Sequence, residues 1–381
     1  MAKSVCIADV CKEIFAGGDV PKSALSYEKT AEYNVPIFSN GEKNCGLYGY
    51  TNNARVKEPS ITVSARGTIG YTAIRTEPFV PVVRLITLTP KSEVIDLDYL
   101  FYATQNYKFE GSGTSIPQLT VPMLKKYKFP LPEMSHQKAI AVKFEKLDQL
   151  ISLRKQQLAK LDELVKAQFV EMFGDPKDNR SNLVKIGEIG DLTSGGTPSR
   201  SNSEYFNGSI RWYSAGELNS LYLPDSIEHI SRTALSQSAA KLFEKGTLMI
   251  GMYDTAAFKM GILTEQSSSN QACANLKPTE QYSVIWLYYL FDIMKPIFLT
   301  ERQGVRQKNL SLSKIRNFNI PSAPLSLQNQ FAAFVECVDQ QKQTVQQSLE
   351  KLELMKKALM QDYFGELPQS PSVTAPSGRE P

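Results

Sequence analysis

The feature that most constrains this chain is an internal repeat with a spacing of 191 residues. The Phe-Gly dipeptide at 173–174 recurs at 364–365, and Leu119 recurs as Leu310. From Gly113 to Gly174 the two copies align without a gap. A gap-free register of this length is typical of a duplicated chain. We therefore expect two similar globular halves, each followed by one helical segment.

The two helical segments, 134–173 and 325–365, have the heptad pattern of a coiled coil. Neither contains an internal proline or glycine, and their apolar residues recur at alternating steps of three and four. At ~1.5 Å per residue each helix would be about 55 Å long, too long to bury its apolar face on one small domain. The predicted seam comprises Ile140, Phe144, Leu147, Ile151, Leu158, Leu161, Val165, Phe331, Val335, Val338, Val345, Leu349, Leu352 and Leu359.

Antiparallel pairing of the two helices is the simplest arrangement, because a whole globular half separates them in the chain. Parallel pairing, or packing of each helix on its own half, stays open. The expected divisions are a first domain (1–133), a first helix (134–173), a second domain (174–324), a second helix (325–365) and a disordered tail rich in Pro and Ser (366–381). The result is a pseudo-twofold repeat.

Each half mixes short β-rich runs with turn clusters, which indicates an α+β fold. The predicted strand regions are 61–63, 80–88, 210–213 and 248–252, and short helices are expected at 98–105 and 283–294. Five cysteines without a Cys-x-x-Cys motif indicate reduced thiols, and no apolar run reaches the ~18–20 residues of a membrane span. We therefore expect a cytoplasmic protein without a membrane contact. The net charge of +4 permits nucleic-acid binding without arguing for it.

Motifs for catalysis are missing from the sequence. It has two histidines, no Gly-x-x-x-x-Gly-Lys-Ser/Thr phosphate loop and no Pro-Pro dipeptide, so the Asn/Asp-Pro-Pro-Tyr/Phe signature of amino-methyltransferases is absent. The one Asp-x-Lys, at 175–177, lies in the predicted linker between the halves. We therefore expect no catalytic residues and no metal ligands on this chain.

Two motifs carry a family resemblance. Residues 194–199 read Ser-Gly-Gly-Thr-Pro-Ser, and 205–212 read Tyr-Phe-Asn-Gly-Ser-Ile-Arg-Trp. The second motif is a glycine-containing loop, a proline-rich junction and a glutamine that begins the long helix, as Gln137 or Gln328 does. With the repeat and the heptads, these motifs resemble the specificity subunits of type I restriction-modification systems over nearly the whole chain. The first half departs from the pattern, because residues 15–21 read Phe-Ala-Gly-Gly-Asp-Val-Pro.

The resemblance implies a non-catalytic DNA-binding subunit. Each globular half would be a target recognition domain that reads one half of a bipartite site in double-stranded DNA. The helices would set the spacer and dock two methyltransferase (modification) subunits, which bring S-adenosylmethionine and methylate adenine. Restriction subunits, which use ATP and Mg²⁺, would join the complex for cleavage. No cofactor would bind this chain. The alternatives are a specificity subunit of a methylation-only or type II system, and a coiled-coil scaffold that joins proteins without DNA.

Candidate DNA-reading residues follow from the side chains that pair with bases and phosphates. Arginine favours guanine, asparagine and glutamine favour adenine, and lysine and arginine contact phosphates. In the first half the candidates are Tyr48, Tyr50, Asn52, Asn53, Arg55, Arg66, Lys108, Ser112 and Thr114. In the second half they are Arg200, Tyr253, Lys259, Asn270, Arg302, Arg306, Lys308 and Asn309.

Overall fold

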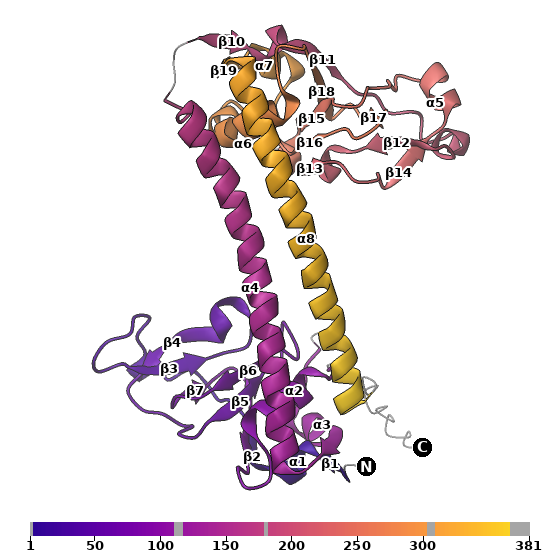
Figure 1. Cartoon of the computed structure of the whole chain (residues 1–381). Helices are drawn as coiled ribbons and strands as arrows, with labels where there is room; N and C mark the ends of the chain where they lie inside the picture. Colours follow the sequence, from indigo (N-terminus) through magenta and orange to yellow (C-terminus); the bar gives the residue numbers. More distant parts are fainter. Residues whose placement is uncertain (1–2, 110–116, 179–181, 303–308, 366–381) are drawn as a thin grey trace, which may run out of the picture. The chain divides into compact units, whose positions relative to one another are not determined.

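The computed structural model describes residues 3–109, 117–178, 182–302 and 309–365 (Figure 1). The chain forms two compact units: a first unit of Met1–Lys155 with Gln347–Pro381, and a second unit of Gln156–Gln346. The division falls inside the two long helices, α4 (Met134–Phe173) and α8 (Leu325–Phe364), and not at their ends. Each unit therefore combines one globular half with a part of both helices, because the helices contribute side chains to both cores.

The first unit is built around a four-stranded antiparallel sheet in the order β2-β8-β5-β6. A smaller sheet, β4-β3-β7, lies on the side of the unit away from the helices, and β1 pairs with β9 next to them (Figure 1). The strands are β1 (Lys3–Cys6), β2 (Cys11–Ala16), β3 (Val35–Phe38), β4 (Leu47–Thr51), β5 (Ser60–Val63), β6 (Thr72–Arg75), β7 (Val80–Pro81), β8 (Ile86–Pro90) and β9 (Lys128–Leu131). The short helices are α1 (Ile7–Val10), α2 (Leu97–Gln105) and α3 (Val121–Lys125).

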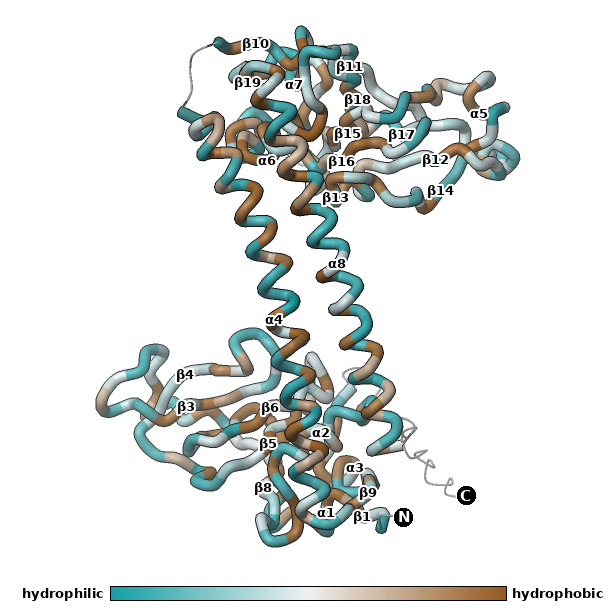
Figure 2. The backbone as a smooth tube through the Cα atoms, in the orientation of Figure 1, coloured by the Kyte–Doolittle hydropathy of each residue, from teal (hydrophilic) through white to brown (hydrophobic). Residues whose placement is uncertain are grey.

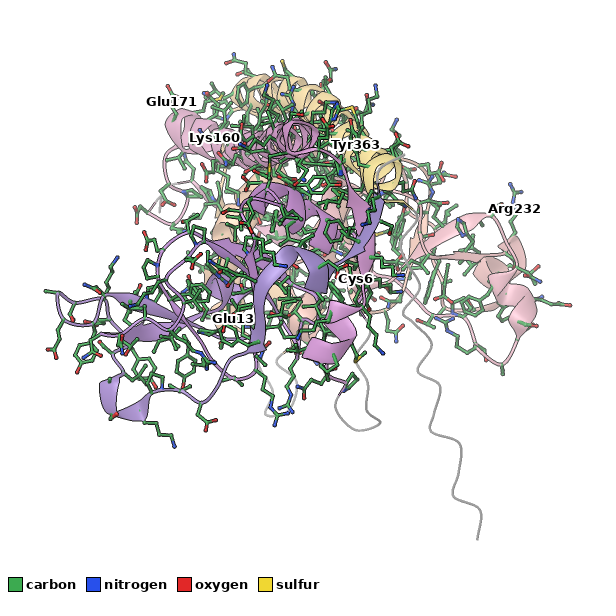
Figure 3. All side chains as sticks on the ribbon, turned by 90° about the horizontal axis from the view of Figure 1, so that it is seen from below. Cys6, Glu13, Lys160, Glu171, Arg232 and Tyr363 are labelled. Atoms are coloured by element: carbon green, nitrogen blue, oxygen red, sulfur yellow. The ribbon has the colours of Figure 1, made fainter. Side chains whose placement is uncertain are left out.

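The second unit repeats this plan with a five-stranded sheet, β11-β18-β15-β16-β13, and a three-stranded sheet, β14-β12-β17. The strands are β10 (Leu183–Lys185), β11 (Gly190–Ser194), β12 (Ile210–Tyr213), β13 (Asn219–Tyr222), β14 (Glu228–Ile230), β15 (Leu248–Gly251), β16 (Met260–Ile262), β17 (Ser268–Ser269), β18 (Cys273–Pro278) and β19 (Asn319–Pro321). The helices are α5 (Arg232–Gln237), α6 (Val284–Thr300) and α7 (Leu312–Asn317). Arg232 projects into solvent from the start of α5 (Figure 3).

One buried glutamine shows how closely the two copies agree. The Gln137 side chain accepts a hydrogen bond from the Asp96 backbone N–H (2.9 Å) and donates to the Val94 and Pro132 carbonyls. In the second copy Gln328 accepts from the Ser283 backbone N–H (2.9 Å) and donates to the Gln281 and Ala323 carbonyls. Asp96 and Ser283 are the N-caps of α2 and α6. Each glutamine therefore connects the proline-rich junction to the start of the neighbouring helix.

The two long helices pair antiparallel within each unit. In the first unit Asp148 pairs with Lys356, and Lys155 lies 2.9 Å from Glu353. Phe144 stacks on Phe364, with ring centroids 5.9 Å apart. This confirms the antiparallel pairing that we expected from the sequence.

In the second unit Asp162 pairs with Lys342, and the rings of Phe169 and Phe331 meet edge to face at 5.2 Å. Hydrophobic and hydrophilic residues alternate along both helices (Figure 2), as a paired helix requires. Charged side chains such as Lys160 and Glu171 cover the exposed faces of α4 (Figure 3). No helix in the described part of the chain is long and apolar enough to cross a membrane.

The end of each long helix enters the core of the unit in which it finishes. Phe364 of α8 is buried in the first unit and packs on Tyr99 of α2, with ring centroids 5.2 Å apart. At the equivalent place in the second unit, Phe173 of α4 packs on Trp286 of α6 at 5.9 Å. Each globular half is therefore completed by the helix that follows the other half in sequence.

Candidate nucleic-acid interface

A polar groove of about 1180 Å³ opens on the first unit where strand-end loops of its two sheets meet. After β5, the Leu119 N–H donates to the Ala65 carbonyl at 3.0 Å, which holds Arg66 of the lining beside Gln118. Sequence analysis named two of the lining residues, Tyr48 and Arg66. The described lining consists of Gly17, Gly18, Asp19, Val20, Lys22, Ser23, Leu25, Tyr27, Tyr48, Arg66, Val83 and Arg84.

Gln118 joins two arginines in this groove. Its Oε1 accepts hydrogen bonds from Nε (3.1 Å) and Nη2 (2.9 Å) of Arg66, and from Nη1 of Arg84 (3.1 Å). Sequence analysis missed Arg84 and Gln118. The repeat contained a signal for Gln118, because it lies 191 residues before the candidate Asn309.

Aromatic and cationic side chains line the rest of the groove. Tyr27 and Tyr48 lie with ring centroids 6.2 Å apart, and their hydrogen bond raises the pKa of the Tyr27 phenol. Both phenolic hydroxyls can donate or accept hydrogen bonds. Beside the groove, the Arg55 guanidinium lies over the Phe15 ring at 4.3 Å, an arrangement that orients an exposed cation.

The other candidates of the first half lie apart from the groove lining. Asn52 and Asn53 are exposed in the loop after β4, whereas Tyr50 is half-buried within β4. Lys108 is exposed after α2. Ser112 and Thr114 lie outside the described residues.

The second unit has the same loop scaffold with different side chains. The Leu310 N–H donates to the Met252 carbonyl (2.8 Å), so Tyr253 takes the place that Arg66 has in the first unit. Asn309 takes the place of Gln118, and its Oδ1 accepts from the Asp254 backbone N–H at 3.1 Å. Tyr253 is exposed at this edge.

A turn before β18 corresponds to the turn that carries Arg84. The Cys273 N–H donates to the Asn270 carbonyl (3.2 Å), as the Leu85 N–H does to Val82 (3.0 Å). Gln271 and Ala272 therefore stand where the first unit has Val83 and Arg84. The Thr197 hydroxyl donates to the Gln271 side chain. At the two positions where the first unit has arginines, the second unit therefore has Tyr253 and Ala272.

Several candidates of the second half have partners within the protein. Arg200 forms a two-pronged ion pair with Glu228, with Nη2 to Oε2 at 2.8 Å, and lies over the Phe206 ring at 4.4 Å. This hydrogen bonding lowers the pKa of the Glu228 carboxyl. The Asn270 side chain accepts from the Ala272 backbone N–H at 3.0 Å. Arg200 and Asn270 thus hold local structure.

The loop of Arg302 to Lys308 is only partly described. Arg302 donates from Nε to the Leu299 carbonyl at 3.1 Å, which ties it to the end of α6. Arg306 and Lys308 lie outside the described residues. Lys259, before β16, is half-buried.

Two glycines allow the sheets to approach one another at the base of these loops. A Cβ on Gly17 would lie 2.5 Å from the Pro81 backbone, next to β7. A Cβ on Gly195 would lie 2.3 Å from the Ser269 carbonyl oxygen, in β17. The first glycine of the Gly-Gly motif therefore forms a close backbone crossing in both copies. Trp212 holds the second copy of this crossing, because its buried indole Nε1 donates to the Gly196 carbonyl at 3.1 Å.

The predicted seam residues face the interior to different extents. The buried members are Ile140, Phe144, Leu147, Val165, Phe331, Val335, Val338, Val345 and Leu349. The half-buried members are Ile151, Leu158, Leu161, Leu352 and Leu359. The described residues contain no cluster of three or more His, Cys, Asp or Glu side chains that could hold a metal ion.

Comparison with known proteins gives one family. The family model described as the type I restriction modification DNA specificity domain matches residues 2–163 and again 179–354. A Mycoplasma pneumoniae protein named as a candidate type I specificity subunit is 38% identical over 141 residues, which is 37% of this chain and 38% of that protein. A second one is 39% identical over 135 residues, 35% of this chain and 40% of that protein. The chain therefore spans about two fifths of the length of these relatives.

More distant relatives and solved structures are also type I specificity subunits or resemble them in fold. The Escherichia coli type I restriction enzyme EcoR124I/EcoR124II specificity subunit is 23% identical over 201 residues, 50% of this chain and 48% of that protein. The crystal structure of a type I S subunit from M. genitalium superposes with a TM-score of 0.61 at 17% identity, over 97% of both chains. A structure of a type I restriction-modification complex gives a TM-score of 0.58 at 16% identity, over 96% of this chain and 98% of that one. At such identities the structures establish the fold.

Proposed function

The chain belongs to the type I restriction-modification DNA specificity family, and from this premise we propose that it is the DNA-reading subunit of such a system. Each globular half is a target recognition domain for one half of a bipartite duplex site. The observation that carries the proposal is the duplicated scaffold, in which Gln137 and Gln328 make the same three contacts and both copies match the family model. A duplicated recognition scaffold suits a DNA site that has two halves.

The chain itself is proposed to be non-catalytic. It supplies sequence recognition, and two modification subunits that dock on α4 and α8 supply S-adenosylmethionine and adenine methylation. Restriction subunits, with ATP and Mg²⁺, join for cleavage. We place the complex in the cytoplasm, where it reaches chromosomal and incoming DNA. The missing amino-methyltransferase and phosphate-loop motifs support this division of labour.

The long helices are proposed to set the unread spacer between the half-sites. Inserting one heptad of seven residues into α4 and a matched heptad into α8 adds ~10 Å of helix and keeps the apolar seam in register. At ~3.4 Å per base pair this lengthens the spacer by about three base pairs. An insertion that leaves both half-sites intact and the spacer unchanged contradicts the role of the helices.

The decisive experiment is to purify the chain from its host with associated proteins, and to sequence the methylome with and without the gene. We expect an adenine methyltransferase to copurify and one bipartite methylated motif to vanish on deletion. If restriction subunits do not copurify, the methylation-only alternative replaces the complete system. An unchanged methylome and no methyltransferase would favour the coiled-coil scaffold.

A further inference from the structure

We propose that Arg66 and Arg84 read guanine in the half-site of the first recognition domain, positioned by Gln118; this inference rests on the proposed function. The two guanidinium groups share one neutral amide oxygen. Within the described residues, neither forms an ion pair with a carboxylate. Asp19 also lines the groove without pairing with either arginine, and two guanidinium groups held together without an ion pair favour a ligand that offers several acceptors at one place.

Each arginine keeps one edge of its guanidinium for such a ligand. Arg66 uses its Nε–Nη2 edge on Gln118, which leaves the edge formed by its two Nη atoms. Arg84 uses only Nη1, which leaves its Nε–Nη2 edge. A guanidinium edge with two parallel N–H groups matches O6 and N7 of guanine in the major groove. A phosphate accepts the same pair of N–H groups, so the experiment below is designed to separate base reading from phosphate contact.

The backbone that carries Arg84 is held in an unusual conformation. Val83 (φ +52°) and Arg84 (φ +65°) both lie in the left-handed region, which valine rarely adopts. The Arg84 N–H donates to the Gly17 carbonyl (3.0 Å), the Val83 N–H donates to the Gly18 carbonyl (2.8 Å), and the Asn40 amide donates to the Val83 carbonyl (2.6 Å). Strained residues fixed by their surroundings are typical of functional sites. Here the conformation aims Arg84 into the groove beside Arg66.

The second unit shows that the scaffold does not need these arginines. Tyr253, Ala272 and Asn309 occupy the positions of Arg66, Arg84 and Gln118. Equivalent backbone hydrogen bonds close the two turns there, but neither Gln271 nor Ala272 has a positive φ, so the left-handed conformation of Val83 and Arg84 is not shared at these positions. A structural role common to both copies therefore does not account for the arginine pair.

The test uses the full chain in complex with its modification subunits. We would select binding sites from random DNA duplexes with the wild type, Arg66→Gln, Arg84→Gln, Arg84→Lys and Lys22→Gln. Lys22 lines the same groove and serves as the charge control. The melting temperature of each complex and its reading of the second half-site report that the variants fold.

We expect the wild type to prefer a G·C pair at one or two positions of one half-site. Each arginine-to-glutamine change should lower the preference for guanine at one position by about 5- to 150-fold and raise that for adenine, with the second half-site unchanged. Arg84→Lys should keep affinity but lose discrimination, because lysine has no paired edge. Lys22→Gln should weaken binding to all sequences alike.

Two results would overturn the inference, and they differ from each other. If the wild type selects a bipartite site and both glutamine variants lose affinity evenly, as Lys22→Gln does, the arginines contact phosphates and only this inference fails. If the wild type selects no bipartite site, the proposed function fails and the inference fails with it.

Discussion

The two recognition domains agree in their scaffolds and differ at the tips of their loops. Gln137 and Gln328 tie the helix starts in the same way, and Gly17 and Gly195 allow the same crossing of strands. At the groove, the first domain has Arg66 and Arg84 where the second has Tyr253 and Ala272. The comparison separates residues that build the fold in both domains from loop residues that differ between them.

The difference also explains why only one copy shows the full sequence motif. Residues 194–199 read Ser-Gly-Gly-Thr-Pro-Ser in the second copy, whereas only the two glycines are kept at 17–18 in the first. Gly17 and Gly195 are required by the close approach of the Pro81 and Ser269 backbone, whereas a Cβ on Gly18 would meet only the Arg55 side chain, at 3.9 Å. The glycine that the close backbone approach requires is therefore present in both copies.

The largest expected effect tests whether the two cores are separate. Phe144→Ala should destabilise the first unit and Phe331→Ala the second, each by about 3–5 kcal/mol, because both rings are fully buried. Hydrogen exchange followed by mass spectrometry would locate the loss of protection. The exposed Leu153→Ala and Leu164→Ala are the matched controls on α4. Equal loss of protection in both units from either phenylalanine variant would show that they unfold as one body.

The shared glutamine gives the next effect. Gln137→Leu and Gln328→Leu should each cost about 2–3 kcal/mol in the free energy of unfolding, since each leaves a partly buried backbone N–H and two carbonyls without their partner. Denaturant unfolding measures both, and the exposed Gln149→Leu should change little. A marked effect in one copy alone would break the equivalence of the two scaffolds.

Transferring the arginine pair to the second domain tests whether the loop residues determine base preference. The triple change Tyr253→Arg, Ala272→Arg and Asn309→Gln should give the second domain a preference for guanine of ~10-fold, or about 1.4 kcal/mol, with the first half-site unchanged. Binding-site selection with the complex would measure it. The single change Asn309→Gln, which adds no guanidinium, is the control. If the triple variant folds and reads its original half-site, base choice resides elsewhere in the domain.

The smallest effect concerns Arg200, which we named as a DNA-reading candidate from the sequence. Arg200→Ala should lower stability by less than about 1 kcal/mol, because its ion pair with Glu228 is largely exposed. The pair lowers the pKa of Glu228. The contribution of the ion pair to the free energy of unfolding is therefore complete above the ordinary glutamate pKa of 4.5. It is lost as the pH falls through the lowered pKa of Glu228 in the folded protein. Unfolding at pH 7 and pH 3, at low and high salt, would measure this, and a changed DNA motif would restore Arg200 as a reader.

The sequence predicted the helices well because heptad periodicity is a local signal and the repeat presents it twice. The first helix was expected at 134–173 and is α4 (Met134–Phe173). Phe169 was missed, because the heptad seam passes through Gln168 while the end of α4 turns its ring into the second unit against Trp286. At the end of α4, contact with the globular core of the second unit, rather than the heptad pattern, determines which side chains are buried.

The groove could not be predicted in the same way. Arg66, Arg84 and Gln118 come from three separate segments. The pairing of β5 with β8 brings Arg66 near Arg84, and the hydrogen bond from the Leu119 N–H to the Ala65 carbonyl brings Gln118 to them. The run 80–88 was expected as one β-rich stretch, but the left-handed turn at Val83 and Arg84 divides it into β7 and β8. Valine and arginine are not typical turn residues, so the left-handed backbone at these positions depends on long-range hydrogen bonds.

The burial of Phe364 among the aromatic rings of the first unit has a consequence for biosynthesis. The ribosome completes β1 to β9 long before it reaches α8, and at ~5–20 residues per second the delay is on the order of ten to fifty seconds. During that time Tyr99 and Phe144 lack one of their packing partners. The nascent first half therefore leaves the ribosome with an apolar face uncovered, which is the kind of surface that chaperones bind.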